Sequence, residues 1–129
     1  MEIQSILEGT KKALGLHREI EDFDPELVMF INSAFAKLQQ LGVGPSQGFE
    51  ISGYDEVWDD FLQYKEMLND VKVFVYLQVR FVFDPPSIAT LNNALAEQLK
   101  EVTWRINTKR EDAEWVNPYE NPPVQLPLF

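Results

Sequence analysis

Two adjacent prolines interrupt the second half of this chain, within the motif Phe83-Asp84-Pro85-Pro86. Neither proline can continue a helix or donate to a sheet ladder, so the chain must stop and change direction there. A very apolar segment precedes the motif and a long amphipathic segment follows it. Because both flanking segments are regular, we interpret these four residues as a structural corner between two elements of one core.

The segment before the corner, residues 71–83, fits two periodicities. Its alternate positions are apolar and mostly β-branched, which is typical of a strand. Its apolar residues also recur at steps of three and four, which is typical of a helix. Thirteen residues are many for a strand, and a helix that is apolar on nearly all sides suits the centre of a bundle. The length therefore favours a helix, with a strand as the alternative.

Three further segments have the apolar period of amphipathic helices. They are residues 3–14, 24–41 and 87 to about 110. Asp24 and Ser87 are suited to cap the second and third of these helices, and Pro25 suits a first helical position. Gly15 and Gly42 follow the first and second segments, where a glycine commonly ends a helix.

Glycine-rich residues 43–54 predict a loop, with room for a short hairpin. Asp55 is placed to cap a short helical turn that carries Trp58. At 129 residues the chain is long enough for one core only. We therefore predict an all-α fold, a small bundle of about four helices in residues 1–111, followed by an extended arm in residues 112–129.

The arm holds four of the eight prolines, interleaved with aromatic and aliphatic residues, so it is not a flexible Gly/Ser linker. Its candidate anchors are Trp115, Pro118, Tyr119, Pro122, Pro123, Leu126, Leu128 and Phe129. A disordered tail is one interpretation of this composition. Because a pre-extended chain loses less entropy on binding, the apolar content favours docking onto a partner. Trp104 lies about 160° from the apolar stripe of the last helix, where tryptophan can anchor an interface.

Composition excludes several classes of function. The chain has no cysteine, so it has no disulfide, thiol nucleophile or zinc–thiolate site. Its net charge of −10 repels phosphates and disfavours generic nucleic-acid binding. Neither a signal peptide nor a bilayer-spanning run is expected. His17 has no catalytic partner at a recognisable spacing, and the acids at 21–24, Asp59 and Asp60 suit helix starts and surfaces better than metal sites.

Four motifs in order resemble the head–tail connector (head-completion adaptor) proteins of tailed bacteriophages. The motifs are Phe23-Asp24 through Phe30-Ile31-Asn32-Ser33-Ala34 to Leu41-Gly42-Val43-Gly44-Pro45; Trp58-Asp59-Asp60-Phe61-Leu62; Val71-Lys72 through Tyr76-Leu77-Gln78-Val79-Arg80 to Phe83-Asp84-Pro85-Pro86; and Glu101-Val102-Thr103-Trp104-Arg105-Ile106-Asn107. The resemblance covers about residues 3–110. It implies a helix for residues 65–83. Phe30 departs from the family pattern, where a polar residue is expected.

The resemblance also implies a function. Such proteins are structural, need no cofactor, and form rings, typically dodecamers, beneath the portal protein. The ring extends the DNA channel towards a stopper or tail-completion protein, and genomic dsDNA passes through without specific binding. We accordingly expect a virion protein at the head–tail junction, present in the host cytoplasm during assembly. We predict subunit contacts at Trp104, Arg105 and Trp58, and portal docking by the arm.

The strong negative charge supports one alternative function. An acidic inhibitor or DNA mimic that binds a host nucleic-acid enzyme would spread its acids along one long exposed face. A connector would instead concentrate acids where its ring is lined.

Overall fold

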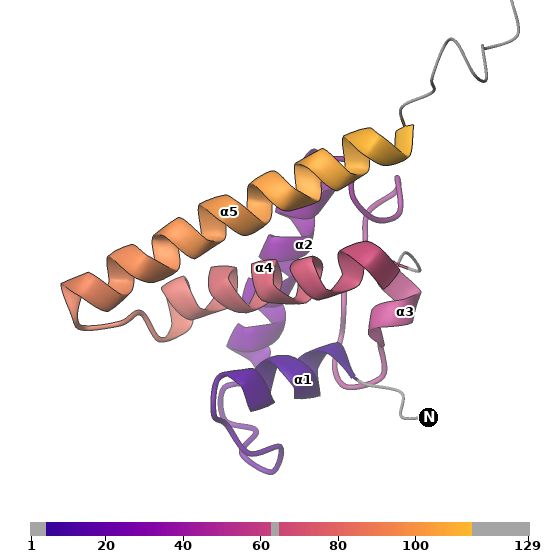
Figure 1. The fold of residues 1–129 in the computed structure, drawn as a ribbon. Coiled ribbons are helices and arrows are strands. Elements are labelled where there is room, and N and C mark those ends of the chain that lie inside the picture. Colours follow the sequence, from indigo (N-terminus) through magenta and orange to yellow (C-terminus); the bar gives the residue numbers. More distant parts are fainter. Residues whose placement is uncertain (1–4, 63–64, 115–129) are drawn as a thin grey trace, which may run out of the picture.

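The computed structural model describes residues 5–62 and 65–114, and within those ranges the regular elements are all helices. They are α1 (Ile6–Ala13), α2 (Asp24–Gln40), α3 (Trp58–Phe61), α4 (Lys65–Phe83) and α5 (Ala89–Glu114). Figure 1 shows α4 between α5 and α1, with α2 crossing behind it. The predicted all-α bundle is confirmed.

The helix α4 lies at the centre of this bundle, where it packs against α1, α2 and α5. Val71, Val75 and Val79 recur every four residues and are fully buried, and Phe74 and Leu77 are buried as well. These side chains project in several directions around the helix, so a single covered face would leave some of them in water. Enclosure on several sides explains why the segment is helical although its alternation fits a strand.

Glycines end the first two helices, as predicted. At the end of α2, Gly42 adopts a φ of 85°, which is costly for any residue with a side chain. That conformation lets the backbone N–H of Val43 donate to the carbonyl of Leu38 at 2.9 Å, which satisfies one of the last helical carbonyls. Gly15, with a φ of 83°, ends α1 in the same way.

The predicted helix starts need two corrections. Asp24 is the first residue of α2 rather than its cap, and the preceding Phe23 offers no capping side chain. The Asp24 carboxylate is instead engaged by a buried lysine described below. Ser87 does not begin the last helix either, because α5 starts at Ala89 and the carbonyl of Ile88 accepts one of its first hydrogen bonds. The chain uses Ser87 and Ile88 to complete the turn after the two prolines.

The loop at 43–54 is held by a side chain of α2 and contains no hairpin. Asn32 donates to the carbonyl of Ile51 at 3.0 Å and accepts from its backbone N–H at 2.7 Å. This pair of bonds replaces the strand partner that a hairpin would have supplied, so Asn32 fixes the loop across the bundle.

The single turn of α3 is capped by Asp60, not by the predicted Asp55. The Asp60 carboxylate accepts from the backbone N–H of Val57 at 3.0 Å. The turn brings two aromatic rings onto Phe35 of α2. The ring centroids of Trp58 and Phe61 lie 6.0 Å and 4.6 Å from that of Phe35. The loop and α3 thus close one side of the core through aromatic packing.

The corner joins α4 and α5 into an antiparallel hairpin (Figure 1). The Phe83 ring packs edge-on against Phe23 with centroids 5.3 Å apart, which fixes the end of α4 to the start of α2. The N–H of Asp84 donates to the carbonyl of Arg80 at 2.9 Å and completes the last helical turn. Pro85 and Pro86 then lie in the connecting turn, where no helical donor is required.

The apolar stripe of α5 is buried over only part of its length. Val102 and Ile106 are fully buried and Leu99 packs against the core. Ile88 and Leu91 are exposed, because the hairpin projects past α2 (Figure 1). The helix also continues to Glu114, beyond the predicted boundary of the bundle at residue 111.

Candidate functional site

The exposed face of α5 carries a tryptophan. The side chain of Trp104 is 66% exposed, whereas Val102 and Ile106 on either side of it in sequence are buried. At 100° per residue these two positions point into the bundle and Trp104 points away from it. A large aromatic surface in water is the kind of feature that anchors protein–protein contacts. Its predicted position outside the apolar stripe is what the structure shows.

A charged cluster beside this tryptophan sets the orientation of α5. Asp70 of α4 is nearly buried and accepts from Arg105 Nε at 3.2 Å and from Lys109 Nζ at 2.9 Å. These charge-assisted contacts fix the rotation of α5 on α4, and with it the direction of Trp104. Arg105 is 44% exposed, so part of its guanidinium also lies on the surface. Its predicted contact with another subunit remains a prediction.

Trp58 lies in the core of the single chain. Its side chain is only 6% exposed and packs against Phe35, and the ammonium of Lys72 lies 5.9 Å from the ring centroid. All these contacts are within one chain, so Trp58 lacks the exposed surface that an interface anchor needs. Its predicted contact with another subunit remains a prediction.

The predicted portal-docking residues lie outside the described residues. They are Trp115, Pro118, Tyr119, Pro122, Pro123, Leu126, Leu128 and Phe129.

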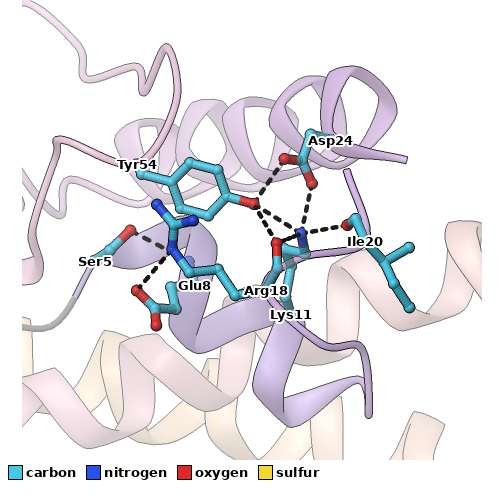
Figure 2. A network of polar contacts seen from close by, with 7 residues as sticks. All are labelled: Ser5, Glu8, Lys11, Arg18, Ile20, Asp24 and Tyr54. Atoms are coloured by element: carbon cyan, nitrogen blue, oxygen red, sulfur yellow. Dashed lines mark hydrogen bonds and ion pairs between the residues drawn. The ribbon is translucent and has the colours of Figure 1, made fainter. Parts of the chain in front are cut away.

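Sequence reasoning missed a buried lysine (Figure 2). Lys11 of α1 is 1% exposed, and its ammonium lies 2.9 Å from the Asp24 carboxylate. It donates to the Tyr54 hydroxyl at 2.7 Å and to the carbonyls of Ile20 and Arg18 at 2.6 and 3.1 Å. Tyr54 in turn donates to Asp24 at 2.7 Å. The buried charge is therefore both paired and hydrogen-bonded, which burial of an ammonium requires.

These contacts favour the charged forms of both Lys11 and Asp24. Burial alone would lower the pKa of Lys11, but the hydrogen bonds to Tyr54 and Asp24 and the charge of Asp24 outweigh it and raise that pKa. Burial would raise the pKa of Asp24, but hydrogen bonds from Tyr54 and Lys11 and the nearby cations lower it. Burial raises the pKa of the Tyr54 phenol, which stays a neutral donor.

The network joins four segments of the chain: α1, the connector after it, the start of α2 and the loop before α3. Arg18 adds a further link, since its guanidinium lies 4.1 Å from the centre of the Tyr54 ring. The only sequence signal is that Lys11 follows Leu7 by one helical turn on the apolar side of α1. We interpret this network as a structural anchor that holds the segment between α1 and α2 in place.

The described residues contain no group of three or more His, Asp or Glu side chains placed to hold a metal ion. His17 is exposed in a shallow hollow beside Lys12, and Asp59 and Asp60 lie on the surface of α3. Over the same part of the chain, no helix has the length and apolarity needed to cross a membrane.

Comparison with known proteins identifies a family. A family model described as phage connector protein matches residues 6–113, which covers the helical bundle almost completely. No curated protein and no solved structure matches the chain.

Replacing Lys11 by methionine should destabilise the chain by about 3 kcal/mol or more, because Asp24 would stay in the interior without its cation. Urea denaturation followed by circular dichroism measures this change. Lys12→Met is the matched control, since Lys12 is the exposed neighbour on the same helix, and its effect should stay within about 0.5 kcal/mol. Equal stability of the two variants would show that the network contributes nothing.

The pH dependence of stability should have two limits. The fold lowers the pKa of Asp24, so its contribution is present above the unfolded pKa and is lost as the pH falls through the folded pKa. The fold raises the pKa of Lys11, so its contribution is present below the unfolded pKa and is lost as the pH rises through the folded pKa. In Asp24→Asn, urea titrations at pH 3–11 should show a shallower acid limb; an unchanged limb would contradict the assignment.

Proposed function

The chain belongs to the phage connector protein family. We propose that it forms a ring of twelve subunits between the portal protein and a stopper or tail-completion protein.

 The match across residues 6–113 is the single observation that carries this proposal. A structural connector role in the phage particle follows from the family itself. The ring, its place at the head–tail junction of the virion and its assembly in the host cytoplasm are our proposal.

The proposed ring extends the DNA channel and does no chemistry. Twelve copies of a chain of charge −10 would carry about −120. An acidic lumen repels phosphates, so DNA would pass through it without being held. Exposed acids gather around the start of α2 and around α3, and either group is available to line the channel. They include Glu19, Glu21, Asp22, Glu26, Asp55, Asp59 and Asp60.

We assign the Trp104 face, defined as Trp104, Arg105 and Lys100, to one subunit contact. A ring closes through a heterologous interface, so each subunit needs two different contact surfaces. Trp104 supplies an exposed aromatic anchor, and Arg105 is oriented by Asp70. The Lys100 side chain is 75% exposed one helical turn before Trp104 and adds a cation to the same face.

We assign residues 115–129 to attachment to the portal. Support comes from their proline, aromatic and aliphatic composition and from their place directly after the end of α5. At about 3.1 Å per residue, an extended chain of this length would reach roughly 45 Å from Glu114. That reach allows contact with a neighbouring protein well beyond the bundle.

Trp104→Ala should impair ring assembly while leaving the fold intact, because the side chain is two-thirds exposed. The full chain would be mixed with the portal protein of the same phage, and the mass of the complexes measured by analytical ultracentrifugation and negative-stain imaging. Met29→Ala, an equally exposed apolar residue on α2, is the control and should assemble normally.

Two results would count against the proposal. If the unaltered chain neither associates with the portal nor forms rings at high concentration, the connector ring is wrong. If Trp104→Ala instead loses more than about 2 kcal/mol of monomer stability, the side chain belongs to the core and not to an interface.

Deleting residues 115–129 should leave the bundle folded and weaken attachment to the portal. The deletion begins after the last residue of α5, so it removes no described helix. Thermal melting followed by circular dichroism checks the fold, and co-sedimentation with portal rings measures attachment. Attachment equal to that of the full chain would refute the docking role of the arm.

A further inference from the structure

The turn between α4 and α5 forms an uncharged apolar tip. Residues 85–96 contain no Asp, Glu, Lys, Arg or His, although a quarter of the chain is charged. Val82, Ile88 and Leu91 are 58%, 64% and 42% exposed. Figure 1 shows that this end of the hairpin projects past α2. We call these three exposed side chains, with the uncharged residues 85–96, the hairpin tip.

The hairpin tip has the composition of a buried protein interface. Ile88 and Leu91 are three residues apart, so they are neighbours on one face of α5. Leu95 continues that face towards the core and is half-buried. Single exposed aliphatic residues are common on protein surfaces. A group of them without any charge is typical of the centre of an interface, where charged residues are depleted.

We propose that the hairpin tip is the second contact surface of each subunit, and that the Trp104 face of a neighbouring copy covers it. This inference rests on the proposed function. It assigns the second of the two contact surfaces that each subunit of a ring needs. Two copies of a chain of charge −10 repel one another over most of their surfaces. They can therefore approach most closely where one of them presents no acidic cluster, as the tip does.

Charge complementarity favours the Trp104 face over a second tip. Asp84 is exposed at the turn and is the nearest charge before the uncharged residues. In contact with the Trp104 face it would approach Lys100 and Arg105, which pair with the exposed Glu97 and Glu101 of their own helix. Two tips in contact would bring two copies of Asp84 together with no cation on either tip. The tip also adjoins the acidic connector, because Phe83 touches Phe23. A head-to-tail contact avoids both repulsions, and such a contact can close into a ring.

The absence of cysteine from the chain allows a direct test by disulfide trapping. Chains carrying Leu91→Cys would be mixed with chains carrying Lys100→Cys under oxidation, at a concentration where the unaltered protein assembles. Nine residues of helix separate the two positions by about 13 Å, too far for a bond within one chain. The two variants differ in mass, so mass spectrometry distinguishes mixed from like pairs.

Each outcome decides the proposal. Mixed pairs in excess over like pairs support the contact between the tip and the Trp104 face. Pairs formed by Leu91→Cys chains alone would show that the tip contacts a second tip and would overturn it. No trapped pair while the unaltered chain still forms rings would overturn the tip assignment and leave the proposed function standing. Failure of the unaltered chain to assemble even with portal would overturn both.

A charge placed on the tip provides the second test. Ile88→Glu with Leu91→Glu should raise the concentration for half-assembly at least about tenfold, since two charges would have to be buried. Met29→Glu is the matched control, because it adds an acid at an equally exposed apolar position on α2. Melting temperatures report whether each variant folds. Normal assembly of the folded tip variant would overturn the proposal.

Discussion

The structure depends on the enclosure of α4. This helix carries apolar side chains around most of its circumference, and Val71, Val75 and Val79 are fully removed from water. Each such side chain contributes about 1.5–3 kcal/mol when buried, so leaving one side of α4 uncovered would cost a large part of the stability of a small domain. Three other helices are therefore placed by the need to cover α4, and the loop with α3 closes the aromatic side of the core.

Local sequence signals predicted well where the helices α1 and α2 end. Gly15 and Gly42 end α1 and α2 because their backbone conformation is unfavourable for other residues. Periodicity alone could not decide between strand and helix for residues 71–83, since an element enclosed on several sides has no polar face to reveal its period. Periodicity also could not predict that the first turns of α5 are exposed. The apolar stripe of a helix does not show how far the helices that cover it extend.

In the candidate site, too, only the features set by local sequence were predictable. The outward position of Trp104 follows from helical phase and was predictable from residues 102–106. The partners of Lys11 and Arg105 were not, because the acids and the phenol they bind lie far away in sequence. Local preference predicted that Asp24 caps α2. Its carboxylate instead pairs with the buried Lys11, because a charge-assisted contact is stronger than a hydrogen bond to a helix end.

The Trp104 face lies on α5, and the hairpin tip includes residues of α4, the turn and α5, so the packing of these elements matters for ring closure. A closed ring needs the same rotation between every pair of neighbours, so the two surfaces of a subunit must keep a fixed relative orientation. The cluster of Asp70, Arg105 and Lys109 fixes the rotation of α5 on α4, and the contact of Phe83 with Phe23 fixes the end of the hairpin on α2. The corner thus carries no chemistry, and its role in the proposed ring is to hold the hairpin tip at a constant angle to Trp104.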